Sequence, residues 1–178
     1  MNGDEIINCI RRIPGLNAEF GGVYMNNFIP STLKNRKNVF FIINSIQDPT
    51  TESFGHWLLV YIHNYQLNYF DSYGLDPSLY GGALFEFIKN YPKTTLNVFS
   101  RELQQENSIV CGIYTIFFSH KMFTRTALKN IKSYFGKNRK SNDAKMLNYF
   151  LKLTGKSFYS TLNHYRLRRT PGRQRSAN

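Results

Sequence analysis

Three residues of this 178-residue chain, His56, Asp71 and Cys111, have the side chains of an activated cysteine nucleophile. Cys111 follows the polar loop RELQQENS and begins the apolar segment CGIYTIFFSHKMF, which we expect to form a buried helix. A thiol at a helix N-terminus has a lowered pKa, because the helix dipole favours the thiolate. A lone cysteine before Gly-Ile-Tyr is also typical of a buried structural residue. The residues alone therefore leave both interpretations of Cys111 open.

His56 and Asp71 lie at the two ends of a predicted β-hairpin. The runs HWLLVYIH (56–63) and QLNYFD (66–71) are strand-like, and Asn64 and Tyr65 separate them. If these two residues form the turn, Asp71 lies diagonally from His56 on the same face, about 7–8 Å away at the backbone, which a hydrogen bond can span. A three-residue turn would put the two side chains on opposite faces. The alternative is a surface histidine and a turn-capping aspartate, and the spacing alone does not decide.

The rest of the chain predicts the elements that position these residues. We expect helices at 4–12 and 78–90, strands at 38–46 and 95–99, an irregular stretch through about 36, a loop at 48–55, and basic amphipathic helices at 125–135, 142–153 and 157–164. This pattern predicts an α+β fold with a central mixed or antiparallel sheet flanked by helices, and the nucleophile at a helix N-terminus. We expect one domain over 1–165 and a flexible basic tail over 166–178.

The composition is typical of a folded, non-secreted protein. Hydrophobic residues make up 42% of the chain and aromatic residues 16%. No apolar run reaches the roughly 18 residues that a membrane span needs, and MNGDEIINCIRR lacks the basic start of a signal peptide. The two cysteines, Cys9 and Cys111, supply neither a disulfide framework nor a metal site, so we expect no metal. A single disulfide is the alternative to the reducing, intracellular setting that we expect.

Basic residues are concentrated in the last third of the chain. Residues 1–120 carry 8 Lys and Arg against 10 Asp and Glu, and residues 121–178 carry 15 against one, which accounts for the 23 basic and 11 acidic residues. This asymmetry favours a polyanion such as nucleic acid, bound non-specifically through its phosphates, over a merely solvated basic surface. The residues that we expect to bind it are Lys129, Lys132, Lys137, Arg139, Lys140, Arg166, Arg168 and Arg169.

Three segments carry a resemblance to a known family. GHW (55–57), NYFDSYG (68–74) and QQENSIVCG (104–112) resemble the His-Trp, acidic and Gln…Cys-Gly motifs of the adenain-like and ubiquitin-like-protein-specific cysteine proteases. The order His, Asp, Cys is that of the family, and the resemblance covers roughly residues 20–120. It implies an adenain-like cysteine protease fold.

The resemblance also implies a role for each site residue. His56 would take the proton of Cys111, and Asp71 would hold the imidazole in the right tautomer. A glutamine and the Cys111 N–H would form the oxyanion hole; the spacing of the ubiquitin-like-protein proteases points to Gln105, which we prefer, and that of the adenains to Gln104. Trp57 and Gly112 would line a narrow substrate channel, which implies small residues such as glycine before the scissile bond.

The chain departs from the family pattern in two places. His56 and Asp71 are 15 positions apart, slightly closer than usual, which implies a shorter hairpin. TLNVFSRELQ lacks the cysteine with which adenain captures its activating peptide, so we expect no covalent activator. DNA or a non-covalent peptide remains as the candidate activator, and the chemistry itself needs no cofactor.

The hypothesis that combines these features is a maturation protease of a DNA virus or virus-like element, which cuts capsid or other virion precursor proteins. It would act in the host cytoplasm or nucleus and within the virion. A deconjugase of ubiquitin-like modifiers has the same active-site requirements and is the main alternative. An acetyltransferase on the same fold and a non-catalytic DNA-binding virion protein are further alternatives.

Overall fold

A five-stranded mixed sheet forms the centre of the protein. The computed structural model describes residues 1–48, 50, 55–92 and 96–158. The strands lie in chain order: β1 (Phe20–Met25), β2 (Asn38–Asn44), β3 (Trp57–His63), β4 (Gln66–Phe70) and β5 (Leu96–Phe99). The two outer pairs, β1 with β2 and β4 with β5, are parallel, and the two inner pairs are antiparallel. The predicted α+β class with a mixed central sheet is confirmed at this level.

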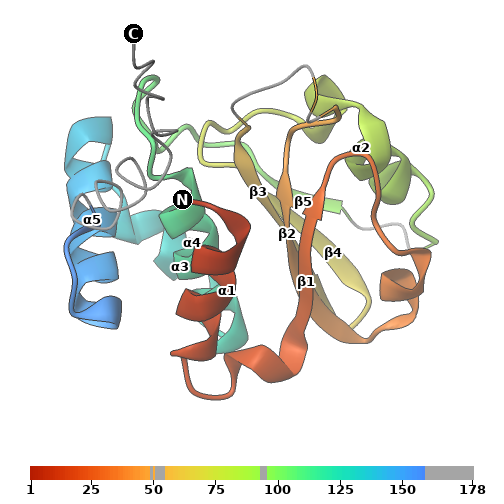
Figure 1. Ribbon diagram of the computed structural model, residues 1–178, viewed down its shortest axis with the longest axis horizontal. Helices are drawn as coiled ribbons and strands as arrows, with labels where there is room; N and C mark the ends of the chain where they lie inside the picture. Colours follow the sequence, from red (N-terminus) through yellow and green to blue (C-terminus); the bar gives the residue numbers. More distant parts are fainter. Residues whose placement is uncertain (49, 51–54, 93–95, 159–178) are drawn as a thin grey trace, which may run out of the picture.

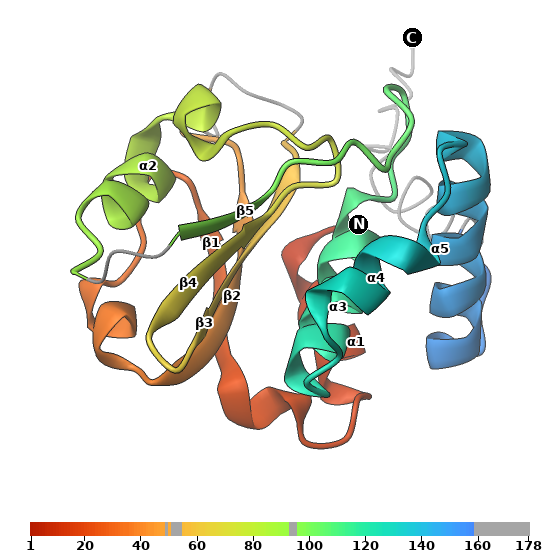
Figure 2. The ribbon, with the colours of Figure 1, turned by 180° about the vertical axis from the view of Figure 1, so that it is seen from behind.

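Helices cover both faces of the sheet, but unequally. They are α1 (Gly3–Arg11), α2 (Gly82–Lys89), α3 (Cys111–Phe123), α4 (Leu128–Tyr134) and α5 (Arg139–Thr154), with short 3₁₀ turns η1 (Leu16–Glu19), η2 (Ser31–Asn35) and η3 (Pro77–Tyr80). Figure 1 and Figure 2 show α1, α3, α4 and α5 on one side of the sheet and α2 on the other. We find no helix among the described residues that is long and apolar enough to cross a membrane.

Each face of the sheet has its own hydrophobic core. Alternate residues of β2, such as Phe40 and Ile42, pack toward α1 and α3, while Phe41 and Ile43 pack toward α2. Burial on both faces explains why β2 and β3 read as continuous apolar runs rather than as alternating ones. Helix α3 is buried at every position from Cys111 to Ser119, because it lies between the sheet and the other helices.

The hairpin between β3 and β4 has the predicted two-residue turn. Asn64 and Tyr65 both adopt positive φ angles, 47° and 62°, as a type I′ turn requires. His63 pairs with Gln66, and Leu59 pairs with Phe70 at the other end of the ladder. Of the two turns that the sequence left open, the structure has the two-residue one, so His56, just before β3, and Asp71, just after β4, lie on the same face.

Two predictions of local structure are wrong. The stretch through residue 36, predicted as irregular, contains β1. This strand has no alternating pattern because all six of its residues are half-buried, and Gly21 is needed where a Cβ would lie 2.7 Å from Val39. The helix predicted over 78–90 is interrupted, because Gly81 and Gly82 have positive φ angles, and they separate η3 from α2.

The remaining boundaries agree with the predictions within a few residues. The basic helices predicted at 125–135 and 142–153 correspond to α4 and α5. The helix predicted at 157–164 lies largely outside the described residues, as do most of the loop predicted at 48–55 and the whole tail 166–178. The boundary between a domain ending at 165 and this tail therefore stays a prediction.

The topology brings four loops to one edge of the sheet. Strands β1, β2, β4 and β5 all end at this edge, and β3 begins there. The loop that precedes β3, the turn that follows β4 and the connection from β5 to α3 therefore meet, as they do at the upper end of the molecule in Figure 1. His56, Asp71 and Cys111 lie in these three segments.

Candidate active site

His56 contacts both of the other candidate residues. Its Nε2 lies 2.6 Å from Oδ1 of Asp71, just beyond the paired ends of β3 and β4. Its ring also hydrogen-bonds the side chain of Cys111. The arrangement gives a carboxylate, an imidazole and a thiol in one hydrogen-bonded series.

Asp71 is fully buried, at 0% exposure, and its carboxylate is surrounded by donors. Besides His56, it accepts the backbone N–H of Tyr73 at 2.8 Å and of Leu75 at 3.2 Å, and the hydroxyl of Tyr80 at 2.8 Å. These four contacts fill the lone-pair positions of an ionised carboxylate. Its orientation toward the imidazole is therefore fixed by the turn that follows β4.

Cys111 is the first residue of α3, and its side chain is nearly buried, with the residue 8% exposed. Burial alone would raise the pKa of the thiol. The hydrogen bond and charge of His56, a hydrogen bond from the backbone N–H of Trp57 and the charge of the chain's amino group together outweigh burial and lower the pKa. The helix N-terminus acts in the same direction.

The pKa of His56 moves in the opposite direction. Burial of the ring opposes its charged form, but the hydrogen bonds and charges of Asp71 and Cys111 raise the pKa to about 9. The ring also stacks on Tyr73, with centroids 4.4 Å apart. A lowered thiol pKa beside a raised imidazole pKa favours a thiolate–imidazolium pair around neutral pH.

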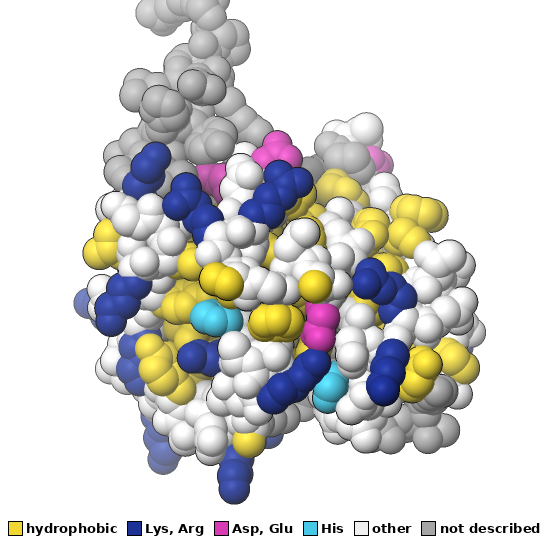
Figure 3. Space-filling view, turned by 90° about the horizontal axis from the view of Figure 1, so that it is seen from below, with side chains coloured by type: hydrophobic (Ala, Val, Ile, Leu, Met, Phe, Trp, Pro, Cys, Tyr) yellow, Lys and Arg dark blue, Asp and Glu magenta, His cyan; other side chains and the backbone are white. Residues whose placement is uncertain are grey.

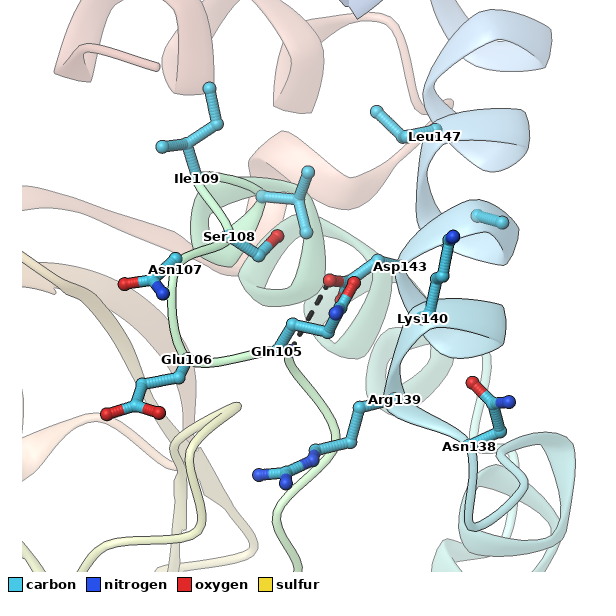
Figure 4. A pocket seen from close by; sticks show the side chains of 12 residues that line it. Gln105, Glu106, Asn107, Ser108, Ile109, Asn138, Arg139, Lys140, Asp143 and Leu147 are labelled. Carbon is cyan, nitrogen blue, oxygen red and sulfur yellow. Dashed lines mark hydrogen bonds between the residues drawn. The ribbon is translucent and has the colours of Figure 1, made fainter.

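The two candidate oxyanion glutamines have different surroundings. Gln104 is fully buried; its Oε1 accepts from the Ser72 hydroxyl at 2.7 Å, and its Nε2 donates to the Ser108 carbonyl at 2.6 Å. Gln105 is exposed and lines a cavity on the far side of the loop, toward α5. Figure 4 shows its side chain directed toward Asp143. Gln104 is thus a fixed part of the loop network, whereas Gln105 points away from it.

Trp57 and Gly112 lie side by side next to Cys111. The indole N–H of Trp57 donates to the Met1 carbonyl at 3.0 Å, and the side chain is 7% exposed. A Cβ at Gly112 would come within 2.9 Å of the Met1 sulfur and 3.3 Å of the Trp57 ring. Gly112 therefore allows the start of α3 to pack closely against Trp57 and Met1.

The predicted polyanion-binding residues lie apart from this site. The described members of the set, Lys129, Lys132, Lys137, Arg139 and Lys140, are all exposed. Arg139 forms an ion pair with Glu102, and Lys132 lies over the ring of Phe99. Arg166, Arg168 and Arg169 fall outside the described residues. Figure 3, seen from the end opposite the candidate site, shows Lys and Arg side chains spread over the surface with few acidic ones.

The sequence prediction missed the residues that support the three site residues. Tyr73 stacks on His56, Tyr80 donates to Asp71, and Ser72 holds Gln104. Tyr73 and Ser72 belong to the motif NYFDSYG, so their nearness in sequence to Asp71 was a usable signal. Tyr80 gave none, because its position depends on the break between η3 and α2.

A cavity of about 860 Å³ lies between the connection to α3 and helix α5. Residues 105–110 line one side of it and α5 lines the other (Figure 4). Among the described residues, no group of three or more His, Cys, Asp or Glu side chains could hold a metal ion.

A scan of the chain against protein-family models and a search of curated proteins both returned no match. The chemical interpretation of the site therefore depends on its own geometry and on the three motifs.

Proposed function

We propose that this protein is a cysteine endopeptidase with an adenain-like fold. The observation that carries the proposal is His56, which joins the buried Asp71 to Cys111 at the start of α3. The pKa directions add support, because they favour the thiolate as the resting form of the nucleophile. A structural cysteine has no need of a histidine that is itself held by a fully buried carboxylate.

The proposed reaction has two steps. The Cys111 thiolate attacks the scissile carbonyl, and the His56 imidazolium gives its proton to the leaving amine, which yields a thioester and a free amine. His56 then takes a proton from water, whose oxygen attacks the thioester and releases the acid and the thiol. The backbone N–H of Cys111 and a glutamine would stabilise the oxyanion in both steps. Gln105, preferred from sequence, and Gln104 both stay candidates for the side-chain donor: the Gln104 amide donates to the Ser108 carbonyl and the Tyr73 hydroxyl, and Gln105 faces α5.

The proposed substrates are virion or capsid precursor proteins, cut after small residues such as glycine. The support for small residues is the motif resemblance, in which Trp57 and Gly112 wall a narrow channel; in the structure the two residues pack against each other beside Cys111. The exposed lysines of α4 and of the turn into α5 support a non-specific contact with nucleic acid in a particle. The proposed setting is the host cell and the virion, with DNA or a non-covalent peptide as the candidate activator.

The test is cleavage of two substrates by the wild-type protein and by Cys111→Ala. One substrate is a capsid precursor with glycine before the cleavage site, and the other is a ubiquitin-like modifier fused through its Gly-Gly end. We expect cleavage of the precursor, read by mass spectrometry, and none with Cys111→Ala. Cys9→Ala is the matched control, because Cys9 is buried away from His56, and it should retain activity.

The outcomes separate the alternatives. Cleavage of the modifier fusion alone would identify a deconjugase instead. Transfer of an acyl group to lysine without hydrolysis would identify an acyltransferase. Cleavage that persists in Cys111→Ala would refute the assignment of the nucleophile.

A further inference from the structure

The connection that leads into Cys111 is held from two sides. On the sheet side, the backbone N–H groups of Leu103 and Gln104 donate to the Ser72 carbonyl, and the Tyr73 hydroxyl donates to the Glu106 carbonyl at 3.0 Å. These contacts attach the loop to the turn that carries Asp71. The geometry between Cys111 and His56 therefore depends on how the loop is held on its other side as well.

On the other side, two adjacent buried residues of α5 hold the loop. Asn142 donates to the Leu103 carbonyl at 3.2 Å. Asp143 accepts the backbone N–H of Gln105 at Oδ2, 3.3 Å away, and also hydrogen-bonds the side chain of Ser108. Asp143 is the only acidic residue after position 120, yet it is only 6% exposed. It points into the protein, toward the loop, while the basic residues near it are exposed.

Asp143 also contacts α3 itself. The hydroxyl of Tyr114, three residues after Cys111, lies 3.0 Å from Oδ1 of Asp143 and 3.2 Å from the Leu103 carbonyl. The Tyr114 hydroxyl is the donor in both contacts, and the Leu103 carbonyl also accepts from Asn142, so each of these buried oxygens has a donor. Asp143 therefore links α5 both to the loop and to the first turn of the helix that carries Cys111.

We propose that Asp143 is a positioning residue for Cys111: by accepting hydrogen bonds from Gln105 and Tyr114, it holds the loop 104–110 in the orientation that presents the thiol to His56. The proposal rests on the thiol chemistry proposed above for Cys111. Asp143 touches neither the sulfur nor the imidazole, and it acts through Gln105, Ser108 and Tyr114.

Few charged groups surround the carboxyl of Asp143. Burial raises the pKa of Asp143, and the hydrogen bonds from Ser108, Tyr114 and Gln105 offset this only in part. The other titratable or charged groups that face it are Tyr73 from the turn after β4, Glu106 from the loop, and Arg139 and Lys140 from α5. Arg139 is paired with Glu102, and Lys140 is exposed at the edge of the cavity, so no ion pair fixes the charge of Asp143 among the described residues.

The experiment measures alkylation of Cys111 by iodoacetamide at pH 7, followed by peptide mass spectrometry, which needs no substrate. Asp143→Ala should lower the rate constant about tenfold, the effect of removing one buried hydrogen bond. Asp143→Asn should stay within about twofold of wild type, because its amide oxygen can accept from Gln105 while its N–H donates to the Tyr114 hydroxyl, which can still donate to Leu103. Asn148→Ala, at an exposed position of the same helix, is the control and should leave the rate unchanged.

Two results would overturn the proposal. Equal losses in Asp143→Asn and Asp143→Ala would mean that the site needs the charge of the carboxylate and not the hydrogen bonds that an amide can replace. A wild-type rate in Asp143→Ala would mean that the residue does not position the loop. If Asp143→Ala fails to fold, as judged by thermal unfolding, Asp143→Asn and Tyr114→Phe carry the test, with about a tenfold loss expected only for the latter.

Failure of the proposed protease function would give a different result. In that case the Asp143 variants would still show the alkylation pattern, but no peptide would be cleaved. Conversely, cleavage that depends on Cys111 together with alkylation that is insensitive to residue 143 would refute only the positioning role.

Discussion

The edge of the sheet and the pair of helices α4 and α5 use charge in opposite ways. At the sheet edge the charge that belongs to the candidate site is buried: Asp71 is 0% exposed and has four hydrogen-bond donors. On α4 and α5 the charges are many, of one sign and exposed, with Asp143 as the buried exception. The buried charge is thus held in one orientation by its hydrogen bonds, whereas the exposed charges act together through the electrostatic potential of the surface.

The comparison also shows that the basic part of the chain has a structural role. Helix α5 holds the loop before Cys111 through Asn142 and Asp143, and Arg101 donates to the carbonyls of Lys132 and Gly136. The segment that we interpreted from sequence only as a surface for nucleic acid is therefore part of the support for the candidate active site. Changes in one region should consequently be testable by their effects on the other.

The largest expected effect comes from the buried charge. Asp71→Asn should lower kcat/KM by about 10³ to 10⁴, because an amide cannot favour the same imidazole tautomer and charge. Steady-state cleavage of a glycine-containing precursor substrate measures it, with thermal unfolding as a check on folding. Asp76→Asn is the matched control, since Asp76 is an exposed aspartate in the same turn that only caps η3, and it should be nearly neutral. Comparable losses in both variants would show that the turn, rather than the carboxylate of Asp71, is required.

The two cysteines allow the electrostatics of the site to be tested within one molecule. Burial raises the pKa of Cys9 to about 11, whereas the pKa of Cys111 is lowered by its partners. Alkylation at pH 6–7 should therefore modify Cys111 about a hundredfold faster than Cys9, because only the thiolate reacts. The reactive thiolate–imidazolium pair is lost as the pH rises through the His56 pKa of about 9 and as it falls through that of Cys111. His56→Ala should remove most of the advantage of Cys111, and retention of the full ratio in that variant would refute the ion pair.

The exposed charges should show a smaller and salt-dependent effect. Replacing Lys129 and Lys137 by alanine should weaken binding to duplex DNA and reduce the slope of log Kd against log salt by about 1 for each phosphate that is no longer neutralised. Fluorescence anisotropy between low and high salt measures this slope. The control is replacement of Arg11 and Arg12, which are also exposed but belong to the end of α1. Equal reductions in both double variants would show that net charge alone drives binding, without a surface on α4 and α5.

The sequence predicted the part of the site that depends on local rules. The hairpin register followed from a two-residue turn at Asn64 and Tyr65, and it correctly placed His56 on the same face as Asp71. The helix that begins at Cys111 followed from an apolar run after a polar loop. Both depend on interactions between residues that are close in the chain, which patterns of residue type record well.

The contacts between distant segments could not be predicted in this way. Nothing near Tyr80 or Asp143 in the sequence indicates that the first donates to Asp71 or that the second holds Gln105, because these contacts depend on how separate elements pack. Strand β1 was missed for a related reason. Its residues are strand-forming only because β2 offers a parallel edge beside them.

The smallest expected effect is on the free energy of unfolding. It tests whether Asp143, unlike the exposed basic residues around it, acts through buried hydrogen bonds rather than through charge. The pKa of Asp143 is raised in the folded protein, so folding favours its protonated form. The stability that this form contributes is fully present below the ordinary aspartate pKa, and it is lost as the pH rises through the raised value. Asp143→Asn does not titrate, so the free energy of unfolding of the wild type should fall relative to that of this variant between about pH 4 and pH 7. Urea unfolding across this range measures the difference. A wild type that instead gains stability over Asp143→Asn as the pH rises would mean that folding favours the ionised carboxyl, and that α5 holds the loop through charge, as the basic surface acts, rather than through hydrogen bonds that an amide can replace.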